Sequence, residues 1–455
     1  MTVKEASKFN RIMIAGTGSG CGKTTMVCAV MKGLLNKGLK VNSFKSGPDY
    51  IDPMFHSKIT GAKSRNLDMF LCGENVVKQL FAENSMDCHI SIIEGVMGFY
   101  DGLGMDTIDY SSNDLSNKTN TPVVLVVNAK GMALSLVALI KGFIEFNENQ
   151  IKAVLLNGIS PAMFQSYKEL IEKRFDIKVL GFIPNLPEAA IESRHLGLIT
   201  ADEIKDLRRK IDILGENAVK YIDLEAIMDI ASSAPELGYE KLDIEKIGST
   251  RIAIAKDKAF CFYYEDNLDL LGRLGAELIP FSPLDDKSLP SDIDGILIGG
   301  GYPELYSKKL SNNISMLRSI KDAYDKGTPI YAESGGFMYF GSTIEGYNMV
   351  NISNHKSELT NKLQNFGYIR LVANRDNLLC KKGESINAHE FHYTKSDFDG
   401  EDFTAIKKST GKERGCIIAD ESIFAGFPHL HLWGNIDFAK GFIEKCLEYR
   451  KSIRP

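Results

Sequence analysis

Long apolar runs, closely spaced cysteine pairs and an excess of basic residues are all missing from this chain of 455 residues. No apolar run reaches the roughly 18 residues that a membrane-spanning helix needs. The first residues, "MTVKEASKFNR", contain no apolar signal-peptide core. The net charge of −5 gives no electrostatic reason to expect a nucleic acid or an anionic membrane as a partner. These absences predict a cytoplasmic globular protein whose partners are small molecules.

The cysteines are too scattered to form a disulfide framework. The chain has 8 of them, none in CxxC spacing, and Cys21 lies inside a glycine-rich loop. We therefore expect free thiols in a reducing compartment. No ligand spacing typical of zinc or iron occurs either.

The length of the chain exceeds what a single hydrophobic core usually serves, so two domains are expected. The first half alternates short, β-branched apolar segments with amphipathic ones. Such strands suit a parallel sheet covered on both faces, and the alternation predicts a doubly wound α/β domain. The predicted strands cover residues 11–16, 40–45, 90–95, 122–129, 152–158 and 178–184.

A change in sequence pattern, from apolar strands to charged and polar residues, separates the two halves. Between about 205 and 250 the chain reads as a charged helix and a polar connector that ends in "SSAPELGYEKLDIEKIGST". We place the domain boundary here, with domains at 1–245 and 246–455. The second domain is also predicted to be doubly wound α/β, because apolar strands return at residues 251–257, 276–283, 295–301 and 328–334.

A phosphate-binding loop is predicted where the first strand meets the first helix, in "AGTGSGCGKTT" (15–25). Glycines let backbone N–H groups surround an anion, Lys23 adds positive charge, and the Thr24 hydroxyl can ligate Mg²⁺. The loop has five residues between Gly16 and Gly22, where the common P-loop has four, and so resembles the dethiobiotin synthetase group. The predicted ATP-binding residues of the loop are Gly18, Ser19, Gly20, Cys21, Gly22, Lys23, Thr24 and Thr25.

Two acidic segments are candidates for the metal and for catalysis. "SGPDYIDPMFH" (46–56) places Asp49 and Asp52 directly after the second strand, and Glu94 ends a later one. Ligands of open α/β sheets bind at the carboxyl ends of strands, so these carboxylates should converge on Thr24. A turn-capping role for Asp52 and a solvent-exposed strand end for Glu94 are the alternatives.

Several motifs occur together and in order over nearly the whole chain. They are "GTGSGCGKTT", "KSGPDYIDPMFH", "EGVMGFYDG", "SRHLGL", "AFCFYYEDNLDLL", "FSPL", "GGGYPELY" and "HEFHYT". This set resembles the cobyrinic acid a,c-diamide synthase family, which implies an ATP- and glutamine-dependent amidoligase of cobalamin biosynthesis. The resemblance further implies Mg²⁺ as cofactor and an acyl-phosphate intermediate, with Lys23 and the metal neutralising charge.

The resemblance also implies roles for individual residues of the first domain. Asp49, Asp52 and Glu94 match the family's metal and substrate loops, and Asn157 fits an adenine-reading position, although a strand-end Asn is also an ordinary cap. The predicted substrate-binding residues are Tyr50, Asp52, His56, His389 and His392, of which the two histidines of "HEFHYT" could equally be structural.

The second domain resembles a class I glutamine amidotransferase. "GGGYPE" (299–304) supplies the glycine turn, with Gly300 and Gly301 at the oxyanion, and His429 takes the position of the base. His431 stands two residues further on, where other class I enzymes often have glutamate, so the third member of a triad is doubtful.

The nucleophile position departs from the family pattern. "TPIYAESGGFMYF" (328–340) predicts a strand, a sharp turn and a helix, with Ser334 at the turn where the family has cysteine. A serine hydroxyl is not ionised by a neighbouring histidine as a thiol is, so weak or absent glutaminase activity is expected, with ammonia taken up directly. Three explanations of this serine stay open: an engineered change, a natural ammonia-dependent synthetase, and a working nucleophile. The last is the least expected, since serine hydrolases favour G-x-S-x-G with a buried acid behind the histidine, and here Ala332 stands two residues before the serine.

Two alternative functions stay open at this point. One is amidation of a related tetrapyrrole such as nickel-sirohydrochlorin, because only the substrate pocket distinguishes it. The other is a non-catalytic ligand-binding relative, against which the intact set of Lys23, Thr24, Asp49 and Glu94 speaks. The oligomeric state, with a homodimer as one option, the order of the two amidations and an ammonia tunnel are not readable from the sequence.

Overall fold

The protein is described by a computed structural model that covers residues 3–190 and 206–453. The motif "SRHLGL" (193–198) lies outside the described residues. The chain divides into two compact units: the first comprises Met1–Met69 and Gly73–Leu242, the second Phe70–Cys72 and Asp243–Pro455. Each unit contains its own sheets and its own core.

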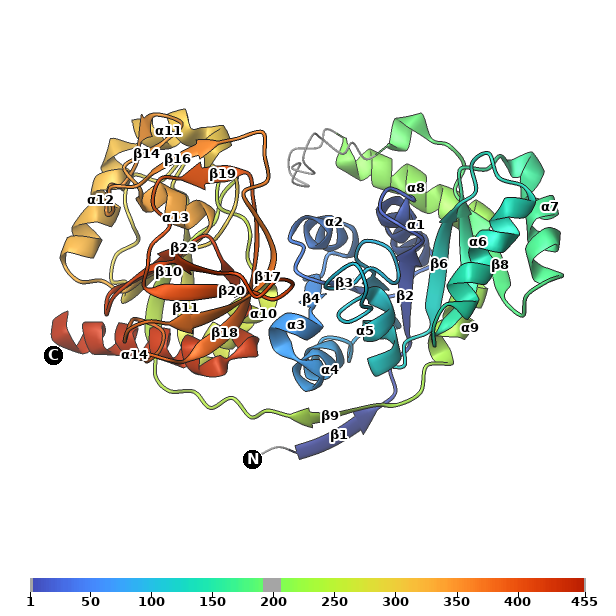
Figure 1. Ribbon diagram of the computed structural model, residues 1–455, viewed down its shortest axis with the longest axis horizontal. Coiled ribbons are helices and arrows are strands. Elements are labelled where there is room, and N and C mark those ends of the chain that lie inside the picture. The colour runs from blue at the N-terminus through green and yellow to red at the C-terminus, as the bar shows by residue number, and fades with distance from the viewer. Residues whose placement is uncertain (1–2, 191–205, 454–455) are drawn as a thin grey trace. The chain divides into compact units, whose positions relative to one another are not determined.

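A parallel sheet forms the centre of the first unit (Figure 1). The six strands predicted from the sequence of this half all occur, with ends shifted by at most two residues; β4 is an addition. In spatial order the strands are β4 (Arg65–Leu67), β3 (Val41–Ser46), β5 (Ile90–Glu94), β2 (Arg11–Gly16), β6 (Val123–Asn128), β7 (Ile151–Asn157) and β8 (Lys178–Phe182).

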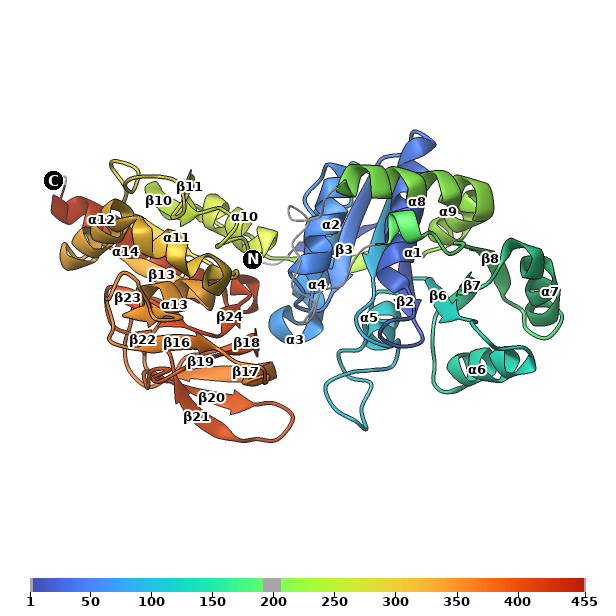
Figure 2. The same ribbon diagram turned by 90° about the horizontal axis from the view of Figure 1, so that it is seen from above.

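Helices cover both faces of this sheet, as the alternating sequence predicts. In Figure 2, α1, α8 and α9 lie on one side and α5 and α6 on the other. The helices of this unit are α1 (Lys23–Asn36), α2 (Ile51–Thr60), α4 (Glu74–Glu83), α5 (Ser112–Lys118), α6 (Leu134–Glu145), α7 (Pro161–Glu172), η1 (Pro187–Ala189), α8 (Leu207–Tyr221) and α9 (Leu224–Ser232). The short helix α3 (Met69–Cys72) consists almost entirely of residues that group with the second unit. A separate antiparallel pair joins β1 (Val3–Ser7) to β9 (Leu237–Lys241).

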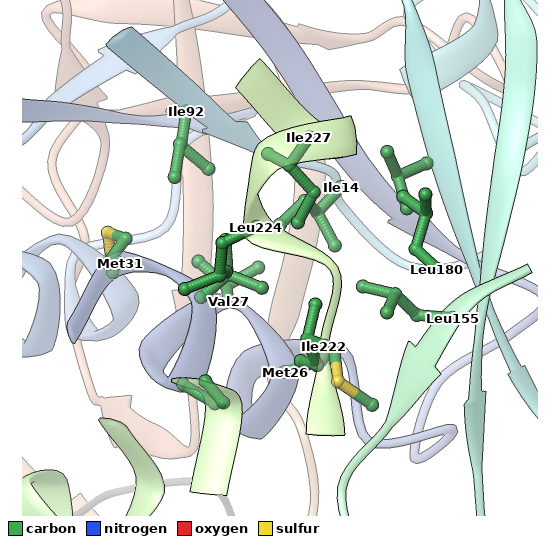
Figure 3. Packing of buried hydrophobic residues seen from close by; sticks show 14 of the residues in the cluster. Ile14, Met26, Val27, Met31, Ile92, Leu155, Leu180, Ile222, Leu224 and Ile227 are labelled. Atoms are coloured by element: carbon green, nitrogen blue, oxygen red, sulfur yellow. The ribbon is translucent and has the colours of Figure 1, made fainter. Parts of the chain in front are cut away.

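The main core of the first unit lies between the sheet and helices α1, α8 and α9. Figure 3 shows buried side chains of this core from α1 (Val27, Met31), from α9 (Leu224, Ile227) and from the sheet (Ile14). Burying such side chains contributes roughly 1.5–3 kcal/mol each. This packing fixes the start of α1, and with it the phosphate-binding loop, relative to the strand ends.

The second unit is built on another, mostly parallel sheet. In spatial order its strands are β11 (Ala276–Phe281), β10 (Thr250–Ala255), β12 (Gly295–Ile298), β13 (Ile330–Glu333), β23 (Ile423–Gly426) and β22 (Ile418–Ala419), the last antiparallel. The helical elements are α10 (Glu265–Leu274), η4 (Pro303–Tyr306), α11 (Ser307–Asn312), α12 (Ile314–Asp325), α13 (Gly335–Phe340), η5 (Leu432–Gly434) and α14 (Ile436–Ile453).

One antiparallel sheet and one small mixed sheet complete this unit, and the sequence had not indicated them. One contains β21 (Glu413–Cys416), β20 (Phe403–Lys407), β17 (Asn365–Ala373), β18 (Ser385–His392) and β24 (His429–Leu430). The other contains β15 (Tyr347–Asn348), β14 (Thr343–Ile344), β16 (Lys356–Leu359) and β19 (Thr394–Ser396). Across residues 3–190 and 206–453, no helix is at once long and apolar enough to span a bilayer.

Candidate active sites

The phosphate-binding loop connects β2 to α1 as predicted. Gly22 precedes the helix with φ of 93°, a left-handed conformation that glycine adopts without strain. A Cβ at Gly22 would lie 2.1 Å from Nδ2 of Asn157, so glycine is also required by this close approach. The Asn157 amide donates to the carbonyl of Cys21 over 2.9 Å and holds the loop. Its reading of adenine stays a prediction.

Lys23 and Thr24 begin α1 and reach toward β5. Lys23 Nζ donates to the carbonyl of Met97 over 2.7 Å, and the Thr24 hydroxyl donates to Glu94 Oε1 over 2.7 Å. The first N–H groups of a helix have no partner inside it, so this end of α1 suits an anion. The structure therefore brings the predicted phosphate loop and the predicted metal carboxylate into direct contact.

Lys45, at the end of β3, lies at the centre of the acidic cluster. Its ammonium is 2.5 Å from Asp52 Oδ2, 3.3 Å from Glu94 Oε1 and 4.0 Å from Asp49 Oδ2. Sequence reasoning overlooked this residue, although a lysine near the end of a predicted strand, four residues before Asp49, was a usable signal. The three carboxylates do converge, and a lysine joins them.

Glu94 keeps its charge although its side chain is 0% exposed. Burial acts to raise the pKa of this carboxyl group, but Lys45 and the hydrogen bond with His56 outweigh it and hold the pKa below its usual range. For Lys45, burial acts to lower the pKa, and the surrounding carboxylates, Asp52 first, raise it instead. Lys45 and Glu94 are therefore charged at neutral pH, whereas burial and the neighbouring Glu94 raise the pKa of Asp52.

The other predicted residues of this unit lie at the start of α2. Tyr50 precedes the helix, and Asp49 Oδ1 accepts a hydrogen bond from the N–H of Ile51 over 2.8 Å. His56 is fully buried, with Nε2 2.7 Å from Glu94 Oε2 and Nδ1 3.3 Å from the Ser64 hydroxyl. His56 thus positions Glu94; its contact with a substrate stays a prediction.

The second site is the turn at Ser334. Strand β13 ends at Glu333, Ser334 adopts φ of 50° and ψ of −105°, and α13 begins at Gly335, so the predicted strand–turn–helix is confirmed. A non-glycine residue in this conformation is strained and is held by its surroundings. The N–H of Ser334 donates to the carbonyl of Gly426 over 2.7 Å, which anchors the turn to β23.

The predicted glycine turn borders both Ser334 and His429. A Cβ at Gly300 would lie 2.7 Å from Cε1 of His429, and one at Gly335 would lie 3.3 Å from the backbone N of Gly301. Only residues without side chains allow these approaches. The turn is tied by Tyr263, whose hydroxyl accepts from the N–H of Gly299 over 2.9 Å.

Glu333 contacts His429 from the residue directly before the turn. Glu333 Oε2 lies 3.2 Å from Nδ1 of His429, and Oε1 accepts from the N–H of Leu430 over 3.0 Å. Both side chains are less than a tenth exposed. Sequence reasoning searched for an acid two residues after His429 and found His431 instead.

Three further histidines of the second unit, His389, His392 and His431, are neutral at physiological pH. His389 faces His429 across β18 and β24, and burial together with His429 lowers its pKa to about 3. His392 stacks on Phe427 with ring centres 3.9 Å apart, and burial lowers its pKa to about 4. His431 is completely buried, which lowers its pKa to about 3. Substrate binding by His389 and His392 stays a prediction.

Comparison with known proteins gives a match to each half of the chain. Residues 12–198 match the CobQ/CobB/MinD/ParA nucleotide binding domain, and residues 251–436 match the CobB/CobQ-like glutamine amidotransferase domain. The two matches fall on the two units that carry the phosphate loop and the Ser334 turn.

Relatives from distant organisms are similar over almost their whole length. A cobyrinate a,c-diamide synthase of Clostridium tetani is 44% identical, covering 95% of this chain and 99% of the relative. The enzymes of the same name from Caldanaerobacter subterraneus and Thermoplasma volcanium are 42% and 40% identical, covering 96% and 98% of this chain and 98% and 99% of theirs. With both domains matched in order, the chain belongs to the cobyrinate a,c-diamide synthase family of ligases.

Proposed function

We propose that this enzyme amidates the a and c side-chain carboxylates of cobyrinic acid, using ATP and acyl-phosphate intermediates. The observation that carries the proposal is the buried cluster of Lys45, Asp52 and Glu94 beside Thr24 of the phosphate loop. A carboxylate cannot react with ammonia until one of its oxygens becomes a leaving group. Such activation needs a bound triphosphate and fixed charges around it, and this cluster has both signs of charge in place.

Phosphoryl transfer is mostly a matter of position and electrostatics. A substrate carboxylate oxygen attacks the γ-phosphorus and ADP leaves; ammonia then attacks the acyl carbon and phosphate leaves with the two acyl-oxygen bond electrons. Lys23 and Lys45 stabilise the charge on the transferred group. Lys45 holds Asp52 in the first turn of α2, where Asp52 can orient the incoming substrate or accept a proton from ammonia.

The residues present also suit Mg²⁺. Among the described residues, no group of three or more Asp, Glu, His or Cys forms a closed metal cage. Mg²⁺ bound with a nucleotide does not need one, since it takes most of its ligands from phosphates and water. Thr24 and Glu94, whose oxygens lie 2.7 Å apart, and Asp49 through water, would hold it. When bound, the ion supplies charge neutralisation to the β- and γ-phosphates.

The nitrogen source is the part of the reaction that Ser334 affects. A serine hydroxyl stays protonated where a thiol would ionise, so its attack on glutamine is slower. We therefore expect this chain to use free ammonia well and glutamine poorly.

The test is product formation from cobyrinic acid, ATP and Mg²⁺, with ammonium or with glutamine as the nitrogen source. We expect the diamide with ammonium and at most a few per cent of that rate with glutamine. Lys23→Ala should abolish both while the chain stays folded. Equal rates with glutamine would overturn the expectation for Ser334. If nickel-sirohydrochlorin were amidated and cobyrinic acid were not, the substrate would be another tetrapyrrole. If neither were amidated, a ligand-binding role would be favoured.

A further inference from the structure

We propose that Glu333 is the acid that orients His429, so that position 334, His429 and Glu333 form a nucleophile–base–acid relay in which the acid precedes the nucleophile in the chain. The inference rests on the proposed glutamine-hydrolysing role of the second unit. It deepens that role by naming the residue that makes His429 a base.

The environment of Glu333 is that of a positioning carboxylate. Its two oxygens interact with three groups: the Tyr331 hydroxyl, the His429 ring and the N–H of Leu430. A carboxylate held at three points cannot rotate away from the imidazole. Because Leu430 follows His429 directly, Glu333 fixes both the backbone and the ring of that histidine.

The alternative acid position, two residues after His429, cannot serve this purpose. His431 there is completely buried and packs against Tyr264, with ring centres 4.9 Å apart and the ring planes tilted by 30°. Within the described part of the chain, neither ring nitrogen of His431 has a hydrogen-bond partner. Glu333 is the carboxylate that the structure puts on the Nδ1 side of His429.

The turn places the nucleophile position and the base beside the same glycine segment. Ser334 is joined to Glu333 by a peptide bond, and its strained φ of 50° turns the chain away from the sheet at this point. Gly300 lies against the His429 ring, and Gly301 lies against Gly335. The nucleophile position and the base thus border one glycine turn, whose N–H groups suit a developing oxyanion.

The proposed reaction of these residues is glutamine hydrolysis through an acyl-enzyme. The nucleophile at 334 attacks the side-chain amide carbon of glutamine and transfers its proton to Nε2 of His429. His429 returns that proton to the leaving nitrogen, which departs as ammonia. Water then cleaves the acyl-enzyme by the same route and releases glutamate. Glu333 accepts the Nδ1–H hydrogen bond throughout and stabilises the imidazolium that forms.

The experiment uses the full-length chain with a thiol at the turn, because a thiol reports its own ionisation. Ser334→Cys is compared with Ser334→Cys combined with Glu333→Gln, with Glu333→Asp as a milder second variant. Glu421→Gln in the same background is the matched control, since it removes the charge of a carboxylate that is 86% exposed and, among the described residues, pairs only with Lys445 at 3.7 Å. The parent chain, which has serine at 334, corrects for the other cysteines. Glutamine hydrolysis and the pH dependence of iodoacetamide labelling at position 334 are measured.

We expect Ser334→Cys to raise the kcat for glutamine hydrolysis at least tenfold over the parent. Adding Glu333→Gln should lower that kcat by about 100-fold with KM little changed, and should move the midpoint of labelling to higher pH, because the thiolate loses its stabilised imidazolium. Glu421→Gln should change either value by less than threefold.

An unchanged kcat and an unchanged labelling midpoint in the Glu333→Gln variant would overturn the inference and make Glu333 structural. A shifted midpoint without any glutamine hydrolysis would keep the relay but remove glutamine as its substrate. Ammonium-dependent synthesis in each variant reports separately on the proposed function of the first unit, so the two failures are distinguishable.

Discussion

Lys45 is the residue on which the charge balance of the ATP site depends. It is 3% exposed and lies within 4.0 Å of three carboxylates, two of them largely buried. Removing one partner of a buried ion pair leaves an uncompensated charge, which typically costs about 3–5 kcal/mol. We predict that Lys45→Met destabilises the protein by about that much at pH 7, as measured by urea unfolding, and abolishes synthesis.

The pH dependence of this effect has a definite sign. The pKa of Glu94 is lowered in the folded state, so its contribution to stability is present above the unfolded-state pKa and is lost as the pH falls. The gap between Lys45→Met and the parent should therefore narrow at pH 4. Lys78→Met, which breaks the i,i+4 pair with Glu74, is the control and should cost under about 1 kcal/mol at either pH. A gap that does not depend on pH would contradict this account.

For Glu304, stability is predicted to change with pH in the opposite direction: it falls as the pH rises. Burial raises the pKa of its carboxyl group to about 7, and Oε2 has no hydrogen-bond partner among the described residues. The native state thus binds a proton that the unfolded chain has released, and stability falls as the pH rises from about 4.5 through 7. We predict that Glu304→Gln has the parent's melting temperature at pH 5 and a higher one at pH 8, by thermal unfolding at both values. Equal curves at pH 8 would show that Glu304 ionises without cost.

Functional residues in local turns could be predicted from the sequence, whereas residues whose partners are distant in the chain could not. Lys23, Thr24 and Ser334 belong to local turns whose geometry depends on neighbouring residues. Lys45 and Glu333 gain their roles from partners distant in the chain, Glu94 and His429, which only the folded sheets bring near.

At the scale of the secondary-structure elements, the glycine turn after β12 packs closely against the backbone near Ala259. Gly301 has φ of 151°, and a Cβ there would lie 2.1 Å from the carbonyl oxygen of Ala259. We predict that Gly301→Ala displaces the turn, destabilises the second unit by at least about 1–3 kcal/mol in urea unfolding and removes any glutamine hydrolysis. Gly272→Ala, at an open position inside α10, is the control and should be neutral or stabilising by roughly 1 kcal/mol. Retained hydrolysis in Gly301→Ala would exclude this turn as the oxyanion site.

Most strands of the two main sheets were predictable because they are short, apolar and separated by helices, but β4, β22 and β23 were not predicted. The strands of the other sheets were not predicted either. Strand β17 alternates buried and exposed residues, and β24 has only two residues, so neither produces an apolar run in the sequence. Yet β24 carries His429 and pairs with β18, and this pairing places the base next to His389.

On the scale of the whole molecule, the chain consists of two compact units, each with a separate buried core. ATP binding is assigned to the first unit, whose loop and acidic cluster are complete within it. A ligand that binds only the folded form stabilises it by RT ln(1 + [L]/Kd), about 2.7 kcal/mol at 100 times Kd. We therefore predict two calorimetric transitions for the full chain, of which ATP with Mg²⁺ raises only the one that belongs to the first unit.

The variants identify the transitions. Lys23→Ala should remove the shift caused by the nucleotide without changing the second transition, and Gly301→Ala should lower only the second. If ATP raised both transitions equally in the parent chain, the units would unfold as one cooperative body, and the two active sites would share their stability. A ligand influences a distant site only through an equilibrium that both sites bias. Nucleotide binding can therefore change the stability of the Ser334 turn only if the two units unfold together.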